Sequence, residues 1–156
     1  MSAEAKIEEL GLTLPPPPPL GGVYKPIVVV GSIAYVSGHG PLLDDGSSYI
    51  TGRVGAELDL EAGQAAARQT GLALLATMRA QLGSLDRVKR IVKTLALVNS
   101  TDEFNQQPAV INGYSELMRD VFGEDAGVGA RSALGTNILP GGIPVEIEVI
   151  IELEDE

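Results

Sequence analysis

Alternating apolar and polar residues near the C-terminus predict a strand with one buried face. From residue 144 to 151, valine or isoleucine occupies positions 145, 147, 149 and 151, and Glu146, Glu148 and Ile150 lie between them. Successive side chains of a strand point to opposite faces of the sheet. The odd positions are therefore expected in the core and Glu146 on the opposite face. In the preceding run, positions 132, 134, 136 and 138 form the more apolar side, which predicts that Arg131 also points away from the core.

The helical pattern is clearest between residues 60 and 82. Asp59 is a plausible N-cap and Gly83 suits the left-handed position after the last turn. The predicted apolar stripe is Ala65, Gln69, Leu72, Ala76 and Leu82. A second helix is expected from Asp102 or a neighbour to about Phe122, and Pro108 falls in its first turn if the helix begins near Asn105. A loop is expected over residues 123–129.

The remaining elements complete an α+β order. Two short strands are expected at residues 27–30 and 33–37, and another at 90–98. The chain is expected to divide into an extension, residues 1–20, and a domain, residues 21–156. The extension would hold a short helix and a polyproline II tract, a stiff lead-in rather than a ligand for an SH3-like partner. The order β-β-α-β-α-β-β then predicts a mixed sheet with both later helices on one face.

The strand at 90–98 is apolar on both of its expected faces. One face would carry Ile91, Leu95 and Leu97, and the other Val92, Ala96 and Val98. Helices cover only one face of a single small sheet. The second apolar face therefore predicts burial against another copy of the chain.

Composition narrows the possible chemistry. The chain has 156 residues, of which 44% are apolar and 21% charged, as in a single globular domain. It has no cysteine and one histidine, which excludes a cysteine nucleophile, a thiolate metal site and a histidine-rich metal site. No apolar run approaches the length of a membrane span, and the N-terminus lacks the pattern of a signal peptide. A cytoplasmic location is expected.

The net charge of −10 argues against a nucleic-acid partner. Binding nucleic acid requires lysine and arginine to neutralise phosphates, and here 11 basic residues face 21 acidic ones. The only basic cluster is Arg87, Lys89, Arg90 and Lys93, at the start of a predicted strand. A solvated edge is the expected role of that cluster.

Arg131 and Glu146 are the candidate pair for catalysis. A guanidinium can hold a carboxylate with two parallel hydrogen bonds, and a nearby glutamate can activate a water. The pattern alone favours a surface ion pair for Arg131 and a solvent-facing strand position for Glu146.

The surrounding motifs resemble those of the reactive intermediate deaminase family, RidA, formerly YjgF and also called endoribonuclease L-PSP. The resemblance covers nearly the whole chain after the proline tract, in the family's order. The matching segments are Gly22-Val23-Tyr24, Tyr35-Val36-Ser37-Gly38-His39-Gly40-Pro41, Val110-Ile111-Asn112-Gly113-Tyr114, Ala130-Arg131-Ser132, Leu139-Pro140 and Val145-Glu146-Ile147-Glu148.

The resemblance implies a chorismate-mutase-like fold, a homotrimer around a central barrel, and sites in the clefts between subunits. No cofactor is implied, and the expected ligand is a small carboxylate. Arg131 would clamp its carboxylate and Glu146 would position a water. Lining roles are implied for five further residues: Tyr24, Ser37, Gly38, Asn112 and Ala133.

Three features depart from the better-known members of the family. His39 stands in place of a glutamine and Ala133 in place of a cysteine, and the stretch from 41 to 58 is longer. His39 is either a structural hydrogen-bonding residue or a proton shuttle.

The first functional hypothesis is hydrolysis of 2-imino or 2-enamino acids to 2-keto acids and ammonia. The alternatives are a non-catalytic protein that binds small carboxylates and, less favoured by charge, an RNA-cleaving translation inhibitor.

Overall fold

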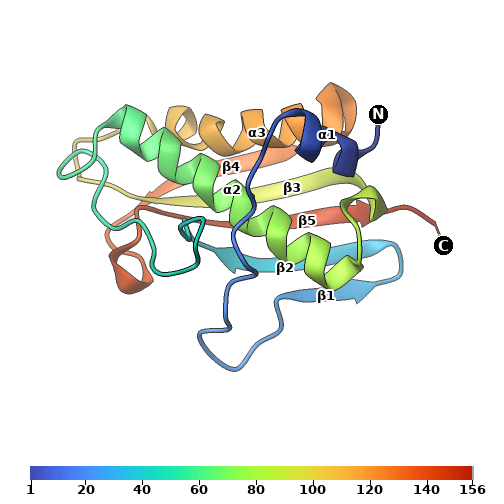
Figure 1. Ribbon diagram of the computed structural model, residues 1–156. Helices are drawn as coiled ribbons and strands as arrows, with labels where there is room; N and C mark the ends of the chain where they lie inside the picture. The colour runs from blue at the N-terminus through green and yellow to red at the C-terminus, as the bar shows by residue number, and fades with distance from the viewer. Residues whose placement is uncertain (156) are drawn as a thin grey trace.

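The computed structural model describes residues 1–155 and confirms the α+β class (Figure 1). The predicted order of strands and long helices is observed, after one short N-terminal helix. The elements are α1 (Ala3–Glu9), β1 (Ile27–Val30), β2 (Ile33–His39), α2 (Leu60–Leu82), β3 (Val88–Asn99), α3 (Gln107–Gly127), β4 (Ala130–Thr136) and β5 (Val145–Leu153), with 3-10 turns at Leu85–Arg87 and Pro140–Gly142.

The strands form one mixed sheet in the order β1-β2-β5-β3-β4. All neighbouring pairs are antiparallel except β3 and β4, which are parallel. Helices α2 and α3 lie together on one face of this sheet, as expected (Figure 1). Strands β4 and β5 follow each other in sequence but are not neighbours, because β3 lies between them.

Helix α2 has the predicted bounds. The Asp59 carboxylate accepts a hydrogen bond from the amide of Ala62 at 2.8 Å, and Gly83 ends the helix with a φ of 85°. The predicted stripe is wrong at Ala65, which is exposed, whereas Ala66 and Ala67 are fully buried. The reason is that α2 packs against both the sheet and α3, so the buried side of its middle is wider than one stripe.

Helix α3 differs from the prediction at both ends. It begins at Gln107 rather than near Asp102, with Pro108 in the first turn as predicted. Its helical hydrogen bonding resumes after Gly123, whose φ of 87° interrupts the helix, and it continues to Gly127. The predicted loop over 123–129 is therefore wrong for most of its length.

An irregularity in β3 changes which residues face the helices. The register with β5 shifts between Ile91 and Lys93. Ile91 therefore joins Ala96 and Val98 in the core instead of lying on the face of Leu95. A period of two cannot reveal such a bulge, and the assignment of Ile91 to the face of Leu95 and Leu97 is wrong.

The face of the sheet opposite the helices stays open in a single chain, and it carries an apolar area beside Glu146 and Glu148. Paired residues share a face, so Val28, Tyr35 and Ile150 form one cross-strand row on it. Val28 and Tyr35 are about half exposed, and so is Leu134 on β4. The expectation of an uncovered apolar face is confirmed.

The N-terminal segment packs against the domain. Ala3 and Ile7 of α1 belong to the main hydrophobic core. The Glu4 carboxylate forms an ion pair with Arg79 of α2, and after α1 the chain passes across α2 towards the β1 edge (Figure 1). Pro15 is buried, so the proline tract is part of the packed structure.

Candidate active site

Arg131 faces helix α3 and is held there by neutral side chains. In the parallel pairing Arg131 lies beside Thr94, whose buried hydroxyl contacts the Tyr114 hydroxyl of α3 at 3.0 Å. Arg131 Nη1 donates to Asn112 Oδ1 at 2.9 Å and to Ser115 Oγ at 3.1 Å. No carboxylate among residues 1–155 forms an ion pair with Arg131. Its positive charge is therefore oriented without being neutralised, as a carboxylate-binding site requires.

A pocket of about 330 Å³ lies beside Arg131, between α3 and the strands. Thr94, Tyr114 and Ser115 contribute to its wall. Burial raises the pKa of Tyr114 to about 12, although the Thr94 hydrogen bond lowers it. The phenol therefore stays neutral at physiological pH. Ser115 was not among the candidates predicted from the sequence, although it lies three residues after Asn112, a spacing that places both on one helix face.

Glu146 lies on the open face of the sheet, beside Gly38 of β2. A Cβ atom on Gly38 would lie 3.0 Å from Glu146 Oε1, so a side chain there requires the carboxylate to shift by a few tenths of an ångström. Burial raises the pKa of Glu146 above its ordinary value, and the negative charge of Glu148 raises it further. No hydrogen bond from residues 1–155 reaches the Glu146 carboxylate, which leaves both oxygens available to water or substrate.

Glu146 borders a pocket of about 430 Å³ that also contains three of the predicted lining residues: Tyr24, Ser37 and Gly38. The Tyr24 hydroxyl accepts a hydrogen bond from the Gly21 amide at 3.2 Å. Ser37 Oγ donates to the Lys25 carbonyl at 2.6 Å, so its hydroxyl proton is already used. These contacts fix the segment before β1 against the end of β2.

The predicted arrangement of Arg131 and Glu146 on one face of adjacent strands is wrong. Glu146 pairs with Leu97 of β3 on the open face, whereas Arg131 pairs with Thr94 on the helix face. The prediction assumed that the more apolar side of β4 faces the core. In the structure Leu134 is exposed on the open side, while Ala133 packs towards the core on the side of Arg131.

The candidate residues therefore form two half-sites on opposite faces of the sheet. The arginine half-site contains Arg131, Asn112 and Ser115, with Ala133 on the same face of β4. The glutamate half-site contains Tyr24, Ser37, Gly38 and Glu146. The sheet itself separates them within one chain.

His39 has a structural environment. Its side chain is buried, with Nδ1 at 2.6 Å from the Ser37 carbonyl and Nε2 at 2.7 Å from Thr77 Oγ1. A carbonyl only accepts, so Nδ1 carries the proton and Nε2 accepts from the Thr77 hydroxyl. Burial lowers the pKa of His39, against the opposite effect of the Ser37 carbonyl. This geometry favours the hydrogen-bonding interpretation over the proton shuttle.

The part of the chain that the structure describes has no cluster of three or more His, Asp or Glu side chains suited to a metal ion. Within the same residues, no helix is both long and apolar enough to cross a lipid bilayer.

Comparison with known proteins defines the family. The family model described as "YjgF/chorismate mutase-like, putative endoribonuclease" matches residues 4–150. The chain belongs to this YjgF/RidA family, in agreement with the motifs around Arg131 and Glu146.

Individual relatives are similar over nearly their full length. Protein TCP17 of Trypanosoma cruzi is 42% identical over 97% of this chain and 94% of its own. The crystal structure of Atu1372, a protein of unknown function from Agrobacterium tumefaciens, is 37% identical with a TM-score of 0.87, covering 97% of this chain and 94% of its own. A "putative endoribonuclease" from Shewanella oneidensis is 28% identical with a TM-score of 0.93, covering 98% and 100%.

Proposed function

We propose that this protein hydrolyses 2-imino and 2-enamino acids to 2-keto acids and ammonia, at sites assembled from two copies of the chain. The observation that carries the proposal is the pair of complementary half-sites. Among residues 1–155, Arg131 is a pre-oriented cation with no carboxylate partner, and Glu146 is a carboxylate with a raised pKa and no hydrogen-bond donor. Arg131 supplies the cation that binds the substrate carboxylate, and Glu146 supplies the base that activates water.

The position of the half-sites constrains the assembly. An interface with two-fold symmetry brings the same patch of both subunits together, so it does not join opposite faces of a sheet. A head-to-tail arrangement joins two different surfaces, and it closes into a ring when the rotation between successive copies brings the last copy back to the first. The half-exposed apolar face around Tyr35 and Leu134 supplies the surface for such a contact. Membership of the family is what favours a ring of three.

The chemistry needs only groups that the two half-sites provide. Arg131 binds the substrate carboxylate, with Asn112 and Ser115 holding the guanidinium in place. Glu146 removes a proton from water as its oxygen bonds to the imine carbon, and the imine nitrogen takes a proton from solvent to become an amine. Protonated Glu146 then returns its proton to that nitrogen as the carbon–nitrogen bond breaks, and the hydroxyl proton passes to solvent. These steps release ammonia and leave the 2-keto acid.

The raised pKa of Glu146 suits this role. A raised pKa makes the Glu146 carboxylate a stronger base towards water, and it increases the fraction of the protonated form that can give a proton to the departing amine. The alanine at position 133 removes the thiol from the arginine half-site. Hydrolysis by this route does not involve that thiol.

Binding of 2-keto acids without turnover is the second candidate function. It is favoured by one observation: the Arg131 half-site by itself satisfies the requirements for holding a carboxylate. RNA cleavage, which the names of several relatives suggest, is disfavoured by the net charge of −10.

The deciding experiment supplies an amino-acid oxidase with an amino acid, so that an imino acid forms continuously. Purified protein should accelerate release of keto acid and ammonia over the uncatalysed rate. An Arg131→Ala preparation at the same concentration is the matched control. Acceleration by neither protein, together with tight binding of 2-keto acids by the parent alone, would favour the binding protein over the deaminase.

A further inference from the structure

Strand β2 contains a β-bulge next to Glu146. Between Val36 and His39 its pairing with β5 slips by one residue. Both of these side chains are consequently buried, although a spacing of three places side chains on opposite faces of a regular strand. Gly38 lies within the bulge, and a Cβ atom on it would be 3.0 Å from Glu146 Oε1. The shape of the bulge therefore decides how closely the backbone approaches the carboxylate.

Ser37, the first residue of the bulge, has all its polar groups hydrogen-bonded. Its amide donates to the Pro26 carbonyl at 2.9 Å, and its hydroxyl donates to the Lys25 carbonyl at 2.6 Å. Its own carbonyl accepts from His39 Nδ1 at 2.6 Å. Three hydrogen bonds thus fix the bulge. Two come from the segment before β1, and the third comes from the imidazole.

The His39 ring joins the bulge to helix α2. With its proton on Nδ1, the ring donates to Ser37 and accepts at Nε2 from the Thr77 hydroxyl, at 2.7 Å. Thr77 is buried, and Met78 beside it belongs to the main hydrophobic core. The imidazole therefore transmits the position of a packed helix to the bulge, from the face of the sheet opposite Glu146.

The groups around His39 favour a neutral ring. They are two phenols, a hydroxyl and an aliphatic side chain: Tyr24, Tyr49, Thr77 and Ile147. Glu146 lies on the other face of the sheet, and no carboxylate among residues 1–155 forms an ion pair with His39. Burial lowers the pKa of His39, against the opposite effect of the Ser37 carbonyl. A proton on Nε2 would also remove the acceptor that the Thr77 hydroxyl uses.

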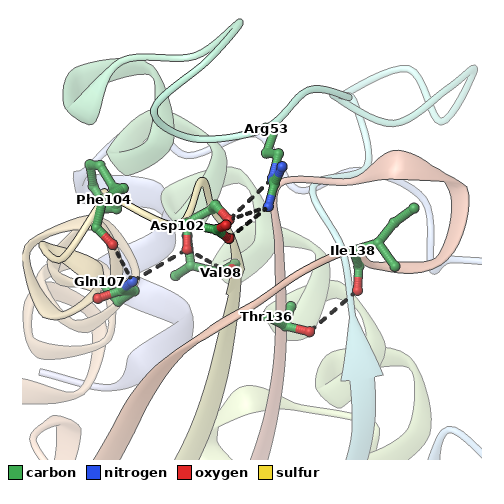
Figure 2. Close-up of polar contacts among 8 residues, drawn as sticks. Arg53, Val98, Asp102, Phe104, Gln107, Thr136 and Ile138 are labelled. Carbon is green, nitrogen blue, oxygen red and sulfur yellow. Dashed lines mark hydrogen bonds and ion pairs between the residues drawn. The ribbon is translucent and has the colours of Figure 1, made fainter.

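The long connection that follows β2 has a separate anchor. Near its end, Arg53 donates twice to the Ser100 carbonyl, at 3.1 and 2.8 Å, and its guanidinium points towards Asp102 (Figure 2). These contacts hold the connection to the end of β3 and do not involve His39. Loss of the His39 hydrogen bonds is therefore expected to act locally, on the bulge.

We infer that His39 is a positioning residue: its neutral ring, hydrogen-bonded at both nitrogens, holds the bulge so that Gly38 forms one wall around Glu146. It acts through Gly38 and does not contact the substrate. The effect on turnover rests on the proposed function. The effect on the titration of Glu146 does not, because that titration is measured without substrate.

Four single variants separate positioning from a general loss of stability. His39→Leu removes both hydrogen bonds of the ring, and Thr77→Val removes one of them. His39→Gln should rescue, because an amide also offers one donor side and one acceptor side on a planar group. Thr70→Val is the matched control. It makes the same exchange at a buried position of the same helix, where the hydroxyl donates only to the Ala66 carbonyl.

The first measurement is the pKa of Glu146, from carbon-13 NMR of its carboxyl group, with Glu146→Gln to assign the signal. Burial raises this pKa in the parent. In His39→Leu and Thr77→Val it should fall towards 4.5, because a displaced wall admits water. The His39→Gln and Thr70→Val variants should titrate like the parent. A parent-like pKa in folded His39→Leu would overturn the inference, and if that variant does not fold, Thr77→Val decides in the same way.

Imine hydrolysis gives the second measurement. In His39→Leu, kcat should fall about tenfold or more while KM changes little, because Arg131 still binds the carboxylate. His39→Gln should keep kcat within about threefold of the parent. Equal losses of kcat in Thr77→Val and Thr70→Val would show a loss of stability and overturn the positioning role. Absence of turnover in the parent would count against the proposed function alone.

The neutral ring has its own test in the pH dependence of stability. Because burial lowers the pKa of His39, the unfolded chain takes up a proton more readily than the folded chain as pH falls through 6.5. The melting temperature of the parent should therefore fall further below pH 6.5 than that of His39→Gln, which has no imidazole to protonate. An identical pH dependence of the two would show that the ring charges freely in the folded protein, and would overturn the requirement for its neutral form.

Discussion

Gly38 and Glu146 lie on neighbouring strands in such close contact that a Cβ atom on the glycine would be 3.0 Å from Glu146 Oε1 and 3.1 Å from its Cδ. The bare backbone of β2 thus forms one wall around the carboxylate. The irregular pairing of β2 between Val36 and His39 brings that backbone into place. His39, immediately after it, anchors the strand to Thr77 of α2.

Gly38→Ala should therefore displace the Glu146 carboxylate. We expect kcat/KM for imine hydrolysis to fall at least tenfold, with little change in melting temperature, because the glycine lies at the open face. Gly22→Ala is the matched control, since a Cβ there would be 3.7 Å from the Tyr24 ring, an ordinary contact. Steady-state kinetics on both variants would check this. Full activity in Gly38→Ala would show that the carboxylate position is not critical.

The fold could be predicted from the sequence because its elements have strong local signals. The Asp59 cap and Gly83 define α2 at both ends, and both are observed. The alternation in β5 placed Glu146 correctly on the open face. These signals act over a few residues, and the structure follows them.

The site could be predicted only as a set of residues. The order of the strands, with β3 between β4 and β5, depends on long-range pairing that no local pattern encodes. The face of β4 was misjudged because Leu134 is exposed in the single chain. An apolar residue on the open face of a sheet has the same local pattern as one that belongs to the core. The separation of Arg131 from Glu146 therefore became apparent only in the structure.

Arg131 should be essential for binding the carboxylate. A charged hydrogen bond contributes about 1.5–3 kcal/mol, so Arg131→Ala should weaken 2-keto acid binding at least tenfold. Arg131→Lys should restore little of it, because an ammonium lacks the planar pair of donors. Asn112→Ala should give a smaller loss, since it removes one of two groups that hold Arg131 Nη1. Calorimetric titration measures all three variants, and Arg119→Ala, on the exposed part of the same pocket, serves as the control. Undiminished affinity in Arg131→Ala would exclude the proposed clamp.

Glu146→Gln should slow the chemical step and should make the folded protein more stable at neutral pH. Loss of the base should lower kcat by about 10²–10⁴ while 2-keto acid binding survives. The pKa of Glu146 is raised in the folded protein by burial and by Glu148. The folded state therefore binds the proton more tightly than the unfolded state, and ionised Glu146 disfavours folding as pH rises through and above the ordinary pKa of 4.5.

The glutamine variant should consequently melt at a higher temperature than the parent at pH 7, and this gain should vanish below pH 4.5, where both states are protonated. The kcat of the parent should rise with pH as Glu146 ionises, at a pH above the ordinary value for glutamate. Thermal melts and rate profiles across this range would check both statements. A glutamine variant that is less stable than the parent at every pH would contradict the assigned electrostatic cost.

Mixed oligomers provide the sharpest test of a site shared between subunits. Arg131→Ala retains Glu146, and Glu146→Gln retains Arg131, so a head-to-tail contact between one copy of each restores an intact site. In a ring assembled at random from equal amounts, about one contact in four has this pairing. Co-expressed variants should therefore recover about a quarter of the parent activity, although each variant alone is inactive. The double variant Arg131→Ala/Glu146→Gln, mixed with either single variant, is the control and should recover none. Light scattering must show oligomers well above the monomer mass of 16.3 kDa. Mixed oligomers without recovered activity would place both residues of each site on one chain, against the geometry of the sheet.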